Sequence, residues 1–359
     1  MRPVSRSSVP VAAASLRDCD AILDTRSPAE FAEDHIPGAI SCPVLDDEER
    51  ARIGALYKQA SPFEAKKRGA ALVARNISFH IENSFKEKPK SWRPLVYCWR
   101  GGKRSGAMTH ILREIGWDAK ALEGGYKAYR RHVVDCLAAL PARFTFRVIH
   151  GATGSGKSRL LRALGAAGAQ VLDLEDLAAH RGSVLGNLPE RPQPSQKMFE
   201  SLLLKNLSDF DNSREVFVEG ESRKIGQLQV PEALINRMRA SECLLLQAGV
   251  ETRVALLMDE YRHFFADLPA LGAQLDCLAA LHGREKVSEW KARAAAGDWH
   301  GLVARLLEDH YDAAYRRSAA QNFPRLAQAR VFALDSAAQS AFDALARDIL
   351  HAGAEALQA

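Results

Sequence analysis

Two short runs of this 359-residue sequence combine the residue types that hold anions. The first, Cys98–Ser105 (CWRGGKRS), places a cysteine before two glycines and three cationic side chains. The second, Gly151–Ser158 (GATGSGKS), has the glycine and lysine spacing of a phosphate-binding loop. The first run predicts a reactive thiolate and the second a diphosphate site. The function therefore has to use two anion-binding loops.

The cysteine loop has the composition that activates a thiol. Cys98 follows a predicted buried strand at 94–97, and a helix is predicted over 105–115 with Ser105 as its cap. Inward-pointing N–H groups and the helix N-terminus would lower the pKa of the thiol. A buried structural cysteine is the alternative, but glycines and cations are poor core material. The expected anion ligands are Arg100, Gly101, Gly102, Lys103 and Arg104.

The glycine loop lies between a strand predicted at 144–150 and a helix predicted at 158–164, which is the context that a P-loop requires. Its N–H groups and the positive helix end would hold a diphosphate, Lys157 would reach phosphate oxygens, and Ser158 could hold Mg²⁺. Such a loop recognises a diphosphate group but not a nucleobase. The motif alone therefore does not predict ATP hydrolysis. The expected diphosphate ligands are Gly151, Thr153, Gly154, Ser155, Gly156, Lys157 and Ser158.

Acidic residues near the ends of later predicted strands are candidates for the carboxylate that accompanies a phosphate-bound metal. Asp173 follows a strand predicted at 169–172, and Glu219 and Glu221 follow one at 215–218. Each carboxylate could equally pair with a nearby arginine in a structural role. No metal site built from protein side chains alone is predicted.

Strand, loop and helix alternate along much of the chain, which predicts an α/β fold with parallel sheets. The break at 141–143 divides the chain into a domain at 1–140 and a P-loop domain at 141–359, whose C-terminal part from about 250 is mostly helical. A further strand is predicted at 243–246. Three prolines within 188–196 predict a loop over the second site.

Composition limits the class of protein. The net charge of +5 is compatible with a polyanionic partner but too small to establish one. Six cysteines without CxxC spacing argue against a zinc knuckle or a disulfide framework and favour a reducing cytoplasm. We expect no secretory signal, because the N-terminal segment has too little apolar length. The sequence also has no apolar run of the roughly 18 residues that a membrane span needs, so we expect no membrane partner.

Further segments extend these patterns into a family resemblance. The cysteine loop, together with 24–31, 35–40 and 124–126, resembles a rhodanese-like domain. Arg104 lies six positions after Cys98, one more than is usual there, and this longer loop is similar to that of phosphatases with the same fold. With the P-loop, the whole resembles the bacterial tRNA 2-selenouridine synthases. The other segments that carry this resemblance are 57–59, 123–127, 180–183, 193–196, 221–226 and 260–261.

The resemblance implies a rhodanese-like domain fused to a P-loop NTPase-like domain. It implies an enzyme that replaces the sulfur of wobble 2-thiouridine in tRNA by selenium from selenophosphate, by way of S-geranylation from geranyl diphosphate. Selenophosphate and geranyl diphosphate are then co-substrates. The resemblance implies no tightly bound cofactor and allows Mg²⁺ to bind. Cys98 would handle selenophosphate or carry selenium. The residues implied to line the diphosphate pocket are His180, Arg181, Glu219, Glu221 and Arg223.

The implied partners are the tRNA anticodon loop and, as a candidate, selenophosphate synthetase. Basic segments at 66–68, 86–90, 127–131 and 316–317 could contact tRNA phosphates or simply be solvated faces. An unstacked 2-thiouridine could stack on Trp92, Trp99 or Tyr126.

Two other functions remain open at this stage. One is a rhodanese-like regulatory module fused to a P-loop small-molecule kinase, and the other is a phosphatase, which only the longer cysteine loop suggests. His35 is more readily explained as a turn residue than as a catalyst.

Overall fold

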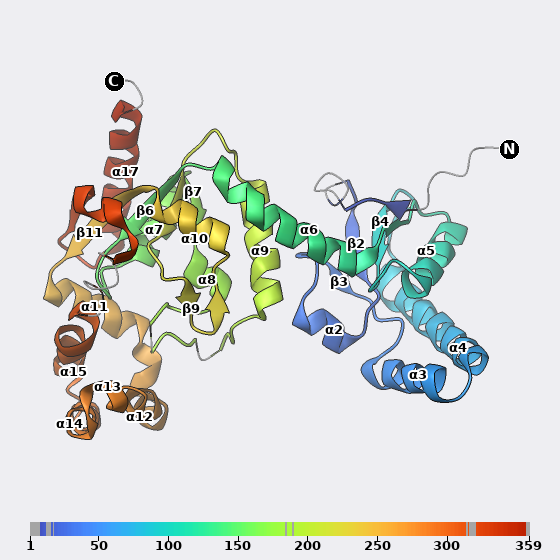
Figure 1. Cartoon of the computed structure of the whole chain (residues 1–359), viewed down its shortest axis with the longest axis horizontal. Coiled ribbons are helices and arrows are strands. Elements are labelled where there is room, and N and C mark those ends of the chain that lie inside the picture. The colour runs from blue at the N-terminus through green and yellow to red at the C-terminus, as the bar shows by residue number, and fades with distance from the viewer. Residues whose placement is uncertain are drawn as a thin grey trace. The chain divides into compact units, whose positions relative to one another are not determined.

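The computed structural model describes residues 8–11, 16, 18–183, 185–188, 190–313, 315 and 321–356 (Figure 1). The chain forms two compact units, one made of Met1–Cys136 and Ser195–Ser208 and the other of Leu137–Pro194 and Asp209–Ala359. A single cut at residue 140, as predicted from the sequence, does not describe this division. Most of helix α9 (Gln196–Asp209) follows the P-loop in the sequence but belongs to the first unit.

The first unit is built on a five-stranded parallel sheet in the order β1-β5-β4-β2-β3. All four residues of the central strand β4 are buried, as their apolar sequence predicts. Leu23 of β2, Val96 of β4 and Met108 of α5 share one apolar core. The elements are β1 (Ser8–Val9), β2 (Ala21–Asp24), α2 (Pro28–Glu33), β3 (Ile40–Ser41), α3 (Asp47–Gln59), α4 (Pro62–His80), η1 (Ile81–Phe85), β4 (Pro94–Tyr97), α5 (Lys103–Ile115), β5 (Lys120–Leu122) and α6 (Gly125–Ala139).

The second unit has its own five-stranded parallel sheet, in the order β12-β11-β6-β8-β7. Helix α7 packs Leu160 and Leu164 into a core shared with Phe342 of α17. The elements are η2 (Leu140–Arg143), β6 (Phe146–His150), α7 (Lys157–Ala166), β7 (Gln170–Leu172), α8 (Leu174–Ala178), β8 (Val216–Glu219), β9 (Lys224–Ile225), β10 (Leu228–Gln229), α10 (Glu232–Arg239), β11 (Glu242–Ala248), α11 (Val250–Glu260), η5 (Pro324–Gln328), β12 (Arg330–Leu334) and α17 (Gln339–Ala356).

Between α11 and η5, short helices gather around the buried Trp290 (Figure 1). They are η3 (Arg262–Phe265), α12 (Leu268–Asp276), α13 (Ala279–His282), α14 (Arg284–Ala295), α15 (Trp299–Leu306) and η4 (Leu307–Tyr311). The predicted α/β class with parallel sheets and a helical C-terminal part is confirmed. Strand β12, which returns from this part to pair with β11, was not predicted from the sequence. Among the described helices, none is both long and apolar enough to cross a membrane.

Helix α9 is held to the first unit by a buried carboxylate. Asp34, which is fully buried, accepts hydrogen bonds from Ser201 Oγ of α9 at 2.9 Å and from Tyr126 Oη of α6 at 2.7 Å. Arg130 of α6 also forms an ion pair with Glu200 of α9. These contacts are distant in sequence, which is why the helical pattern alone could not assign α9 to this unit.

We expect Ser201→Ala to loosen α9. The substitution removes one of the two side-chain donors to a buried carboxylate, which costs about 1–3 kcal/mol. Amide hydrogen exchange over α9 should accelerate. Asn206→Ala is the matched control, because the side chain of Asn206 donates to Leu202 O within the helix and has no other hydrogen bond among the described residues. Equal exchange in both variants would contradict the anchoring role of Asp34.

Candidate active site

The cysteine loop lies at the carboxyl end of the central strand β4 and is backed by a glycine turn. Tyr126 N donates to Cys98 O at 2.8 Å and Lys127 N to Trp99 O at 3.0 Å. Gly125 has φ +57°, and a Cβ there would lie 2.2 Å from Cys98 O. Only glycine can occupy this position. The Gly124-Gly125-Tyr126 segment therefore fixes the backbone of the cysteine loop.

The sulfur of Cys98 is buried and accepts hydrogen bonds. Gly102 N donates to Sγ at 3.3 Å and Ser105 Oγ at 3.2 Å. Burial raises the pKa of this thiol, but hydrogen bonds from Ser105, Gly102 and Arg100 outweigh it and leave the pKa below its usual value. The expectation that Ser105 caps the helix is wrong. Helix α5 begins at Lys103 with Gly102 as its cap, which frees the Ser105 hydroxyl to reach the sulfur.

Ser105→Ala should raise the pKa of Cys98, because a donor to the thiolate is lost. Peptide mass spectrometry can follow the rate at which iodoacetamide alkylates Cys98 as a function of pH. The midpoint of this pH profile should lie about one pH unit higher in the variant. Thr109→Ala is the control, since Thr109 Oγ1 lies one turn along α5 and donates to Ser105 O instead. A profile that stays in place in Ser105→Ala would show that its hydroxyl does not set the thiol pKa.

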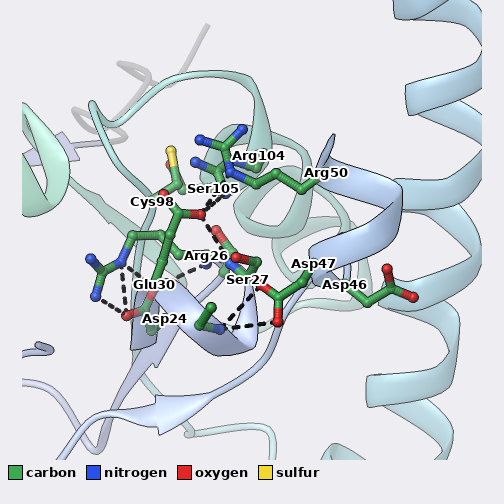
Figure 2. A network of polar contacts seen from close by, with 12 residues as sticks. Asp24, Arg26, Ser27, Glu30, Asp46, Asp47, Arg50, Cys98, Arg104 and Ser105 are labelled. Carbon is green, nitrogen blue, oxygen red and sulfur yellow. Dashed lines mark hydrogen bonds and ion pairs between the residues drawn. The ribbon is translucent and has the colours of Figure 1, made fainter. Parts of the chain in front are cut away.

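Arg104, an expected anion ligand, is paired with a carboxylate of α2. Arg104 Nη1 and Arg50 Nε each lie 2.9 Å from Glu30 Oε2, and Figure 2 shows both arginines beside this carboxylate. Burial raises the pKa of Glu30, but Arg104, Ser27 N–H and Arg50 lower it to about 2. The pair thus orients Arg104 at the loop.

The other two cations of the loop are differently placed from Arg104. The side chains of Arg100 and Lys103 are exposed, and no ion pair engages either of them within the described part of the chain. Both are free to meet an incoming anion.

The remaining rhodanese-like segments form the frame behind this loop. Arg26 is buried, pairs with Asp24 at 2.6 Å and stacks its guanidinium 3.9 Å from the ring centre of Tyr126. His35 stacks on Phe31 at 3.9 Å and its Nδ1 lies 2.9 Å from Phe31 O. These contacts support the interpretation of His35 as a turn residue.

The P-loop connects β6 to α7, as predicted. Lys157 Nζ donates to Gly151 O at 2.9 Å, which places the ammonium group across the loop. Gly156 has φ +85°, and a Cβ there would lie 2.7 Å from Phe342 of α17. A side chain at this position would disturb both the loop and the core. The ring of His150, which ends β6, is buried, and burial with the nearby Lys157 lowers its pKa to about 4, so it is neutral at pH 7.

Four carboxyl groups gather beside Ser158. Ser158 Oγ donates to Glu175 Oε2 at 2.8 Å, and Glu175 N donates to Glu219 Oε1 at 2.8 Å. Burial and then the charge of Glu221 raise the pKa of Glu175 to about 8. Asp173 accepts from Asp176 N and caps α8. Glu175 was not predicted as a site residue, although the acidic segment after β7 indicated this region.

The carboxylates after β7 and β8 were expected either to accompany a metal or to pair with an arginine. Within the described residues, no three His, Cys, Asp or Glu side chains are arranged to hold a metal ion. In the same part of the chain, no arginine forms an ion pair with Glu219.

The residues expected to line the diphosphate pocket have different surroundings. The Arg181 guanidinium lies 4.7 Å from the ring centre of Tyr261. A Cβ on Gly182 would lie 2.8 Å from Glu221 and 3.0 Å from Glu175, so this turn contacts the carboxyl cluster. His180 is buried, and its Nδ1 accepts from Gly182 N at 3.1 Å, a structural role in that turn. Arg223 is exposed at the start of the β9–β10 hairpin.

An apolar cavity of about 60 Å³ adjoins the P-loop. Thr153 forms part of its wall, and the rest comes almost entirely from aliphatic and aromatic side chains of the helical part, including Leu257, Tyr261, Leu271 and Leu302. No pattern in the sequence pointed to this cavity, because its walls come from the P-loop, from Leu185 and from several helical segments that only the fold brings together.

Of the three aromatic residues expected to stack a base, only Trp99 is accessible. Its side chain is 37% exposed, whereas Trp92 and Tyr126 are buried in the first unit, so the expectation for these two is wrong. The ring of Trp99, the residue after Cys98, packs against the ring of Tyr126, and the two ring centres are 5.2 Å apart.

The basic segments expected to contact tRNA differ in their surroundings. Arg130 is occupied by Glu200, and Lys67 and Arg68 face Glu64 on α4. Lys88 lies over the Trp92 ring, with Nζ 5.6 Å from its centre. The segment 316–317 lies outside the described residues.

Two protein families match this chain. One, described as the tRNA 2-selenouridine synthase AAA domain, matches residues 144–268, and the rhodanese-like domain matches residues 9–132. A tRNA 2-selenouridine synthase from Marinobacter nauticus is 32% identical over 82% of this chain and 87% of its own length. Relatives of the same name from Nitrosomonas europaea (36%) and Hydrogenovibrio crunogenus (37%) align over 67% of this chain and over 63% and 67% of their own lengths.

Proposed function

The chain belongs to the tRNA 2-selenouridine synthase family, and we propose that it converts wobble 2-thiouridine of tRNA to 2-selenouridine with selenophosphate, by way of an S-geranylated base. The Cys98 loop would process selenophosphate, and the P-loop would hold the diphosphate of geranyl diphosphate. Each loop then acts on the same base in a different step.

The observation that carries the choice of geranyl diphosphate is the position of Thr153, which belongs to both the P-loop and the wall of the apolar cavity. A prenyl diphosphate joins a diphosphate directly to a hydrocarbon chain. A nucleobase needs polar partners, and this cavity offers almost none. A prenyl diphosphate therefore suits the combination better than ATP does.

In the first step, the sulfur of 2-thiouridine attacks C1 of geranyl diphosphate. A C1–S bond forms, the C1–O bond breaks, diphosphate leaves with the bonding pair, and the base loses its N3 proton to solvent. Lys157 and the N–H groups of the loop stabilise the charge that develops on the leaving group. Mg²⁺ would neutralise further charge, with Ser158 Oγ and Glu175 as the oxygen ligands beside the diphosphate.

In the second step, the Cys98 thiolate attacks the phosphorus of selenophosphate. An S–P bond forms, the P–Se bond breaks, and hydrogen selenide leaves; water later hydrolyses the S–P bond. Selenium in selenophosphate is fully reduced, so transferring it onto the sulfur of Cys98 would require an oxidant, whereas attack on phosphorus requires none. Arg100, Lys103 and Arg104 would hold the phosphoryl oxygens.

Hydrogen selenide then replaces the alkylated sulfur. Selenium attacks C2, the C2–S bond breaks, geranyl thiolate leaves, and the selenium proton moves to N3. Alkylation makes the sulfur a better leaving group, which explains why geranylation precedes selenation.

Mass spectrometry of nucleosides from 2-thiouridine tRNA tests this proposal. With geranyl diphosphate alone, the S-geranyl base should accumulate, and adding selenophosphate should convert it to 2-selenouridine. ATP consumption with unmodified tRNA would instead support a P-loop kinase. Phosphate release from many phosphate esters without tRNA modification would support a phosphatase.

A further inference from the structure

The apolar cavity beside the P-loop is lined by residues of two packing regions. Leu257 packs against the loop, because a Cβ on Gly154 would lie 2.7 Å from Leu257 Cγ. Leu257 shares a small core with Leu307. Leu271 and Leu302, which also line the cavity, belong to the core around Trp290 in the helical part. The cavity therefore runs from the phosphate-binding backbone into the helical part.

The lining suits hydrocarbon over its whole length. One polar group of the lining is the hydroxyl of Tyr261. It forms a hydrogen bond with Ser183 Oγ at 3.2 Å. Leu271, Leu302 and Leu306 are all at most 5% exposed, so their methyl groups form an apolar wall. Such a surface gains free energy only from an apolar occupant.

The size of the cavity limits its occupant. At roughly 10–15 Å³ per water-sized group, 60 Å³ accommodates about four to six such groups. This is close to the carbon content of one isoprene unit. A geranyl chain would therefore fit this space more readily than the longer farnesyl chain.

We infer that this cavity binds the hydrocarbon chain of the prenyl diphosphate and that Leu271, which lines it on the side of the helical part, limits the chain to the length of geranyl. The inference rests on the proposed function and adds a residue that sets specificity. Leu271 lies on α12, which contributes no residue to the P-loop, so its effect on the reaction should be confined to the choice of chain.

Leu271→Ala in the full chain tests the inference, with Leu275→Ala as the matched control. Both residues lie on α12 and in the same core, but only Leu271 lines the cavity. The ratio of kcat/KM for farnesyl diphosphate to that for geranyl diphosphate, measured with 2-thiouridine tRNA, should rise at least about fivefold in Leu271→Ala. It should stay at the wild-type value in Leu275→Ala.

The outcomes separate the two claims. An unchanged ratio in Leu271→Ala, with geranylation intact in the wild type, overturns the cavity as the chain site and leaves the proposed function standing. A wild-type protein that uses no prenyl diphosphate overturns the proposed function and this inference with it. Leu271→Val and Leu275→Val provide the same comparison with a smaller loss of core volume, and calorimetric binding of both diphosphates without tRNA gives a second readout.

Discussion

Cys98→Ser is expected to abolish selenation of 2-thiouridine tRNA, by about a thousandfold or more, while S-geranylation continues at nearly the wild-type rate. A serine hydroxyl is not ionised at neutral pH, so the donors that lower the pKa of Cys98 cannot produce a nucleophile from it. Alkylation of the base uses the P-loop, which lies in the other unit of the chain. The S-geranyl base should therefore accumulate in this variant.

The control for this experiment is Cys136→Ser. Cys136 is a half-buried thiol of α6 in the same unit, and burial, followed by the charge of Asp135, raises its pKa, so it is no competing nucleophile. Both reactions should proceed normally in that variant. Parallel loss of geranylation and selenation in Cys98→Ser would show that the two loops do not act in separable steps.

The proposed attack on phosphorus adds a second readout. Rapid quenching of the wild-type protein with selenophosphate should trap a phosphorylated Cys98, identified by peptide mass spectrometry, and Cys98→Ser should release no phosphate. If the trapped peptide carries selenium on Cys98 instead of phosphate, the thiolate does not attack phosphorus.

The two loops could be predicted from the sequence because each is a local structure. A cysteine after a buried strand and the spacing of Gly151, Gly156 and Lys157 dictate backbone geometry within a few residues, and the structure has both loops at the carboxyl ends of central strands. The helix of the cysteine loop was misplaced by two residues, since glycine can cap a helix without a side-chain signal.

The features that escaped prediction depend on contacts between distant residues. Glu175 reaches Ser158 because α8 turns back at the end of β7. Helix α9 joins the first unit because a serine meets Asp34, 167 positions away in the sequence. The cavity is assembled from separate helices, none of which has an unusual pattern. Burial of Trp92 and Tyr126 likewise follows from packing that composition does not reveal.

Lys157→Ala should lower kcat/KM for geranyl diphosphate by about 10²–10³-fold. Its ammonium group reaches across the P-loop and donates a hydrogen bond to Gly151 O. When the diphosphate binds, the ammonium group can donate to a diphosphate oxygen instead. As the C1–O bond breaks, negative charge grows on that group, so the loss should appear in kcat as well as in KM. Selenation of tRNA that has already been S-geranylated should proceed, because that reaction needs only the Cys98 loop.

Arg162→Ala is the matched control for Lys157→Ala. Arg162 lies on the same helix and its side chain is exposed, and its Nε donates to the carbonyl oxygen of Ser158, the last residue of the loop. Removing this cation should change geranylation little, since an exposed charge is screened by solvent. If both variants lose activity equally, the effect is one of overall charge on α7. If Lys157→Ala geranylates tRNA at the wild-type rate, the diphosphate binds elsewhere and the P-loop has no part in the alkylation.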